Sequence, residues 1–128
     1  MSEALTPAQL AIMNVLWDRG EATAAEVHEA LRAERDVAAT TVATMLTRLE
    51  RKGVVAHRTE GRQFVYRACT AREDVRESVL GSFVEHLFAG DVALAVSHLL
   101  ARDEVSPDEL ARVRRMIDAR EREIGEGR

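Results

Sequence analysis

The sequence predicts a mostly α-helical fold with one small β-hairpin, and three observations lead to this prediction. Helix-starting patterns recur along the chain, apolar residues return every three or four positions after each of them, and strand-like alternation occurs only around residues 54–67. The chain has 128 residues, of which 46% are hydrophobic, so it can bury a core. This length suits one domain or two small ones.

Helix starts are marked by the capping-box pattern, in which Ser or Thr is followed three residues later by Glu or Gln. The pattern occurs at Thr6-Pro7-Ala8-Gln9, Thr23-Ala24-Ala25-Glu26, Thr70-Ala71-Arg72-Glu73 and Ser106-Pro107-Asp108-Glu109. Asp91 can cap a further helix. Glycines follow three of the expected helix ends, at Gly20, Gly53 and Gly90. These signals predict helices over 7–19, 23–34, 39–52, 71–89, 92–102 and 107–124.

The apolar period changes after Gly53. Residues 54–58 and 63–67 alternate as two short strands. Between them, residues 59–62 form a predicted hairpin turn with Gly61 at the position that needs a positive φ. Three helices followed by a β-hairpin are the parts of a winged helix-turn-helix, in which the third helix recognises DNA and the hairpin forms the wing. Residues 1–69 are therefore predicted to be a winged-helix DNA-binding domain.

The helix predicted over 39–52 has two different faces. One face is apolar and carries Val42, Met45, Leu46 and Leu49. The opposite face carries Thr40, Thr41, Thr44, Thr47, Arg48 and Arg51. Solvated helix faces are usually rich in Glu and Lys, whereas Thr is a poorer helix former. Thr hydroxyls can bond phosphates or base edges, and Arg can reach phosphate or guanine, so this face suits a DNA groove. A plain solvated face is the alternative that this helix alone leaves open.

The overall charge of −4 conceals a positive middle segment. Residues 38–69 hold six basic residues against two acidic ones, a net charge of +4, and each flanking segment carries −4. A localised phosphate-binding surface needs such a distribution. Within the hairpin, Arg58 and Arg62 are the basic residues expected to reach the DNA backbone.

The remaining residues, 70–128, are predicted to form a three-helix dimerisation region. Its helices carry many large apolar residues, and the residues expected at the dimer interface are Val79, Phe83, Leu87, Leu110, Val113 and Ile117. Three such helices in about 58 residues cannot readily bury all their apolar side chains within one small unit. A homodimer would cover the remainder. Packing back onto the N-terminal domain is the alternative.

Four short motifs occur in an order that is typical of a known protein family. They are Ile12-Met13-Asn14-Val15-Leu16-Trp17, Thr40-Thr41-Val42, Leu46-Thr47-Arg48-Leu49-x-x-Lys52-Gly53 and Phe64-x-Tyr66. In this order, followed by three helices, they resemble the penicillinase-repressor family of bacterial transcription regulators, of the BlaI and MecI type. The resemblance implies a homodimeric repressor that binds an inverted-repeat operator in double-stranded DNA. Carried over by position, it places DNA contacts at Thr40, Thr41, Thr44 and Arg48, and around Arg58 and Arg62 in the wing.

The resemblance also implies a mode of release. Repression in the family is relieved when a membrane sensor protease triggers cleavage within the dimerisation part, at an Asn-Phe bond in the fifth helix. The aligned pair in this chain is His98-Leu99. The region is therefore similar, but the bond is not.

No enzyme, cofactor or metal site is expected. Four histidines are scattered without ligand spacing, at His28, His57, His86 and His98, and the single cysteine, Cys69, cannot form an internal disulfide. No apolar run approaches the roughly 20 residues that cross a bilayer, so we expect no membrane insertion and a cytoplasmic protein. Two other functions remain as alternatives: a winged-helix protein-interaction adaptor that does not bind DNA, and a ligand-sensing regulator.

Overall fold

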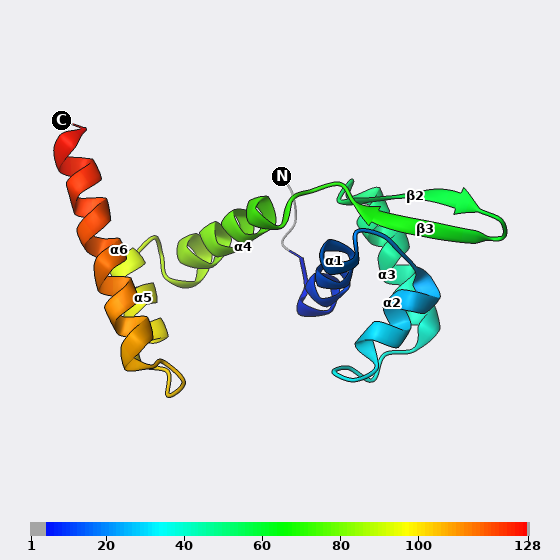
Figure 1. Ribbon diagram of the computed structural model, residues 1–128, viewed down its shortest axis with the longest axis horizontal. Helices are drawn as coiled ribbons and strands as arrows, with labels where there is room; N and C mark the ends of the chain where they lie inside the picture. The colour runs from blue at the N-terminus through cyan, green and yellow to red at the C-terminus, as the bar shows by residue number, and fades with distance from the viewer. Residues whose placement is uncertain (1–4, 128) are drawn as a thin grey trace. The chain divides into compact units, whose positions relative to one another are not determined.

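The computed structural model describes residues 5–127 and confirms the predicted fold class (Figure 1). Its N-terminal elements are α1 (Pro7–Arg19), β1 (Ala22–Thr23), α2 (Ala24–Leu31), α3 (Ala39–Arg51), β2 (Val55–Glu60) and β3 (Gln63–Ala68). Three further helices follow, α4 (Arg72–Leu87), α5 (Val92–Leu100) and α6 (Pro107–Glu126). Among all the helices of residues 5–127, no single one is long and apolar enough to cross a membrane. Only α4 and α5 taken together reach that length and composition, with a bend of 104° between them.

The chain separates into two compact units, the first ending at Ser82 and the second beginning at Phe83, within α4. The start of α4 is attached to α1 in the first unit. Trp17 Nε1 donates a hydrogen bond of 2.9 Å to the carbonyl oxygen of Thr70, and Arg72 forms an ion pair of 2.7 Å with Asp18. The division between DNA reading and dimerisation expected at residues 69 and 70 is a functional boundary, and it stays a prediction.

The predicted helix starts are confirmed where side-chain caps form. Thr6, Thr23 and Ser106 each form a complete capping box, and Asp91 caps α5 by accepting a hydrogen bond of 3.0 Å from the Leu94 N–H. Helix α4 begins at Arg72, one residue later than expected, and α2 ends at Leu31 rather than at residue 34.

The hairpin belongs to a three-stranded antiparallel sheet of order β1-β3-β2. Strand β1 was not predicted, because two residues are too few to show alternation. Glu60 pairs with Gln63, so the hairpin loop consists of Gly61 and Arg62. Gly61 has φ +63°, as the turn prediction required, a conformation that Gly adopts without the steric cost of a Cβ.

The core lies between α1, α2, α3 and the sheet. Its fully buried aliphatic side chains are Ile12, Met13, Leu16, Val27, Val42, Leu46, Leu49 and Val55. Met45, expected on the same inner face of α3, is only partly buried and lies at the edge of this core. The apolar stripe of α3 is therefore narrower than the sequence suggested.

The last three helices bury much less. Of the described residues, α4 buries only Val75, α5 buries only Ala95, and α6 buries none. Their exposed large apolar side chains are Leu80, Phe83, Leu87, Val92, Leu94, Leu99, Leu100, Leu110, Met116, Ile117 and Ile124.

Candidate nucleic-acid interface

Helix α3 is held so that its Thr and Arg side chains face outward. Val42, Leu46 and Leu49 are 0% exposed and fix the inner face of the helix against the core. The side chains on the opposite face are all exposed, namely Thr40, Thr41, Thr44, Thr47, Arg48 and Arg51. The helix rotation inferred from its two faces is therefore confirmed. The burial of three aliphatic residues is what sets it.

Four of the predicted contact residues gather in one place. Thr40, Thr41, Thr44 and Arg48, together with Met45, line a shallow hollow on the surface of α3. The hollow has a thioether and Thr methyl groups for apolar contact and hydroxyl and guanidinium groups around them. This is the mixture needed to read a base edge, because thymine presents a methyl group and guanine presents two acceptors in the major groove.

The threonine hydroxyls are not equivalent. Thr44 Oγ1 donates to the carbonyl oxygen of Thr40 at 3.0 Å, and Thr47 Oγ1 donates to that of Ala43 at 3.1 Å. With their hydrogens engaged on the helix backbone, these two oxygens present lone pairs outward. The hydroxyls of Thr40 and Thr41 have no partner within residues 5–127, so they can donate or accept.

The N-terminus of α3 differs from those of α1, α2, α5 and α6. Its N-cap is Ala38, and no described side chain caps it. The N–H groups of the first turn therefore stay available to an external acceptor, in the same turn as the exposed Thr40 and Thr41. Helix N-termini bind phosphate through such N–H groups.

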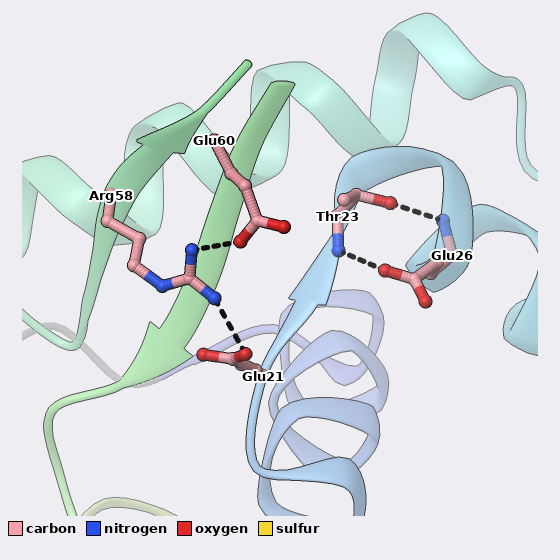
Figure 2. Close-up of polar contacts among 5 residues, drawn as sticks. All are labelled: Glu21, Thr23, Glu26, Arg58 and Glu60. Carbon is pink, nitrogen blue, oxygen red and sulfur yellow. Dashed lines mark hydrogen bonds and ion pairs between the residues drawn. The ribbon is translucent and has the colours of Figure 1, made fainter. Parts of the chain in front are cut away.

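The arginines of the predicted interface fall into two groups. Within residues 5–127, the side chains of Arg48, Arg51 and Arg62 form no ion pair, and Arg62 is exposed in the hairpin loop. Arg58 is different, since its guanidinium lies between the carboxylates of Glu21 and Glu60 (Figure 2). The Nη2 atom of Arg58 is 2.8 Å from Glu21 Oε1, and Nη1 bonds Glu60 Oε2. The hydrogen bonds to Glu60 and Glu21 raise the pKa of Arg58 above its ordinary value.

One contact between α3 and the wing was not expected from the sequence. His57 Nδ1 on β2 lies 2.5 Å from Glu50 Oε1 on α3, and the His57 ring stacks on Phe64 with centroids 4.0 Å apart. Burial and the negative charge of Glu50 raise the pKa of the neighbouring Tyr66 hydroxyl. The chain turns sharply at Gly53 between Glu50 and His57, so helical or strand periodicity could not have paired them. The contact joins the hairpin to the C-terminal part of α3.

A helix with a buried aliphatic face and an exposed Thr and Arg face, followed by an antiparallel hairpin, defines a winged helix-turn-helix domain of the DNA-binding class. The family model described as penicillinase repressor matches residues 5–119. The chain belongs to the penicillinase repressor family. The predicted family and general function, a DNA-binding transcriptional repressor, are thereby confirmed, and the family is one of repressors rather than enzymes.

Individual relatives are similar over most of this chain. The transcriptional regulator BlaI of Mycobacterium tuberculosis is 37% identical over 122 residues, which cover 91% of this chain and 83% of that protein. The penicillinase repressor of Bacillus licheniformis is 29% identical over 114 residues, 89% of each chain. The solution structure of monomeric Bacillus licheniformis BlaI in complex with the blaP half-operator is 32% identical. It superimposes with a TM-score of 0.50 and covers 58% of this chain and 90% of that one.

Proposed function

We propose that this repressor acts as a homodimer on an inverted-repeat operator, with each α3 in a major groove and each hairpin on the adjacent DNA backbone. The observation that supports this most directly is the pair of faces on α3. Three aliphatic residues there are 0% exposed, and every Thr and Arg of the opposite face is exposed. The positive middle segment of the chain coincides with this helix and hairpin.

Each side chain of the interface has a proposed task. Arg48 and the threonines at 40, 41 and 44 face base edges, because they share one hollow. Arg51, Arg62 and the first-turn N–H groups of α3 bind phosphates, which position the domain without reading sequence. Arg58 would contribute to phosphate binding only after giving up its carboxylate partners.

The relative bound to a half-operator supports the inverted repeat. The printed description of that complex pairs one monomeric BlaI with one half-operator. If this chain binds in the same way, a complete operator takes two copies. Their recognition helices would then lie about 34 Å apart, or a multiple of one helical turn.

The exposed apolar residues of the last three helices support the homodimer. Phe83 is 54% exposed, Leu87 is 67% and Ile117 is 51%. Leu110 is at the border of exposure, and Val79 and Val113 are partly buried. Large apolar patches of this kind mark interaction surfaces. A second copy of this chain would supply matching faces by two-fold symmetry.

We further propose that proteolysis in α5 releases the operator, through the indirect action of a membrane sensor protease. His98 and Leu99 are both exposed in α5, and a cut between them would separate α6 from the rest of the chain. The test is intact-mass analysis of the repressor recovered from cells grown with and without a β-lactam. A fragment ending at His98, found only in treated cells, is expected. The intact chain in both samples would contradict this mode of release.

We infer that the protein acts in the cytoplasm. A selection experiment with the purified protein tests the DNA-binding proposal. Duplexes are selected from a random pool on the purified protein, and the enriched sequence and a scrambled version are then compared by fluorescence anisotropy over a range of salt. An enriched inverted repeat that binds with a steep salt slope is expected. Failure to enrich any sequence, with equal weak binding to all duplexes, would favour the protein-interaction adaptor.

A further inference from the structure

Arg58 is the predicted wing contact that the fold already supplies with acceptors. Glu60 lies two residues further along β2, on the same face of the strand as Arg58. Glu21 directly precedes β1, so it reaches Arg58 from the other side of the central strand β3. Figure 2 shows both carboxylates at the guanidinium, Glu60 from β2 and Glu21 from the segment just before β1. Arg58 thus has two acidic partners.

The neighbouring basic residues lack this arrangement. Within the described chain, Arg62 has no acidic partner, and the guanidinium of Arg67 contacts only the thiol of Cys69, at 3.6 Å. A guanidinium presents its donors in a fork that fits a carboxylate or a phosphate equally well. Two carboxylates around one guanidinium also give this part of the hairpin a local charge of −1, whereas binding to DNA phosphates requires positive charge.

We propose that Glu21 and Glu60 lower the DNA affinity of the wing by competing with DNA phosphates for the guanidinium of Arg58. This inference rests on the proposed function, in which the hairpin lies on the DNA backbone. Phosphate contacts carry no sequence information. The two carboxylates therefore lower affinity for every duplex alike and leave the preference for the operator unchanged. Their effect is to shift the protein concentration at which it occupies DNA.

The first test is Glu60→Gln, which removes one charge and keeps the shape of the side chain. The three side chains of these ion pairs are exposed, with exposed fractions of 51% for Arg58 and Glu21 and 66% for Glu60. The variant should therefore fold. Binding is measured by anisotropy on a mixed-sequence duplex of about 30 base pairs and on the selected operator, over a series of salt concentrations. We expect affinity to rise roughly threefold to tenfold on both duplexes, with a salt slope steeper by about one ion. Glu21→Gln should act in the same direction, and the double variant should exceed either.

The chain offers a closely matched control in its second unit. Arg102 and Glu104 also form an exposed ion pair at a spacing of two residues. Glu104→Gln changes the net charge by the same amount and frees one arginine, but that arginine belongs to the other unit and not to the hairpin. It should leave DNA affinity within twofold of the wild type. Equal gains from Glu104→Gln and Glu60→Gln would overturn the proposal, since net charge alone would then explain them.

A second variant tests whether the effect passes through Arg58. In the wild type, Arg58→Gln should weaken binding no more than about twofold, because the guanidinium is already occupied. In the Glu60→Gln background the same change should abolish the gain. A gain that survives in Arg58→Gln/Glu60→Gln would overturn competition and would mean that Glu60 repels DNA directly. If neither the wild type nor any variant binds DNA, the proposed function itself fails, and this inference fails with it.

Discussion

Both halves of this chain contain helices that carry large apolar side chains, yet the two halves bury these side chains to very different extents. Helix α3, with 13 residues, buries three large aliphatic side chains completely, and α1 contributes three more to the same core. Helix α6 is longer, with 20 residues, and none of its described residues is buried. A periodic apolar stripe therefore indicates that a helix must pack, but not that its own chain provides the partner.

The difference follows from the geometry of the partners. In the first unit, three helices and a small sheet surround one another, so each apolar stripe meets another from the same chain. In the second unit, the apolar residues of α4, α5 and α6 remain at the surface of the single chain. The winged-helix domain is thus complete in one copy. We propose that a second copy covers the exposed apolar side chains of the second unit.

The largest effect on stability should come from the core of the first unit. Leu46→Ala removes a side chain that is 0% exposed and should lower the free energy of unfolding by about 2–5 kcal/mol. Leu80→Ala, at a side chain that is 60% exposed, should cost less than about 1 kcal/mol. Urea unfolding followed by the fluorescence of Trp17, the single tryptophan, measures both. Equal losses would erase the contrast between the buried core of the first unit and the exposed apolar side chains of α4.

A large effect on operator binding should come from the second unit. Ile117→Asp places a charge on the exposed apolar stripe of α6 and should produce monomers at micromolar concentration. Operator affinity should fall by about 100-fold or more, because the two half-sites are no longer bound by linked domains. Sedimentation and anisotropy give the two readouts. Ala111→Asp introduces the same charge elsewhere on α6 and should leave the dimer intact, and a wild-type protein that sediments as a monomer would contradict the dimer.

A smaller effect separates base reading from phosphate binding within the first unit. Arg48→Ala should cost roughly 1–3 kcal/mol on the operator and relax the preference at one base pair, as expected for a bidentate contact to guanine. Arg62→Ala should weaken binding to all duplexes alike and reduce the salt slope by about one. Anisotropy on operator and scrambled duplexes distinguishes the two. Uniform weakening by Arg48→Ala would reassign Arg48 to a phosphate.

The smallest effect concerns the capping box of α2. The Thr23 hydroxyl accepts a hydrogen bond of 3.1 Å from the Glu26 N–H, and Thr23→Ala should cost about 1 kcal/mol of unfolding free energy (Figure 2). Ser106→Ala removes the equivalent cap of α6 and should leave the Trp17-monitored transition nearly unchanged. A loss from Ser106→Ala as large as that from Thr23→Ala would mean that the two units unfold together.

Glu26 adds a pH dependence to the same cap. Hydrogen bonds from the backbone and side chain of Thr23 hold the pKa of the Glu26 carboxyl below its ordinary value of 4.5. A carboxyl with a lowered folded pKa stabilises the fold above its ordinary pKa. That contribution is lost as the pH falls through the lowered value. Unfolding measured between pH 6 and 3 should therefore show a smaller loss in Glu26→Gln than in the wild type. Identical pH profiles would remove Glu26 from the cap.

The agreement between prediction and structure is uneven for physical reasons. The helix starts at Thr6, Thr23, Asp91 and Ser106 could be predicted because each cap is a local interaction within four residues. The face of α3 could be predicted because helical periodicity fixes which side chains point together. Strand β1 could not, since a strand of two residues exists only through its pairing with β3.

The interface divides in the same way. The gathering of Thr40, Thr41, Thr44 and Arg48 followed from positions on one helix. The engagement of Arg58 by Glu21 did not, because 37 residues separate the partners along the chain. Counting charges along the sequence placed Arg58 among the free cations of the wing, and the fold instead supplies it with two carboxylates.

By itself, the sequence determined the helices, the hairpin, the family and the Thr and Arg face of α3. Capping hydrogen bonds and apolar periodicity depend only on residues a few positions apart in the chain. The tertiary structure alone decided the third strand, the Glu50–His57 contact between helix and wing, and the pairing of Arg58. Each of these joins groups that the chain separates and that only the packing of the core brings within reach.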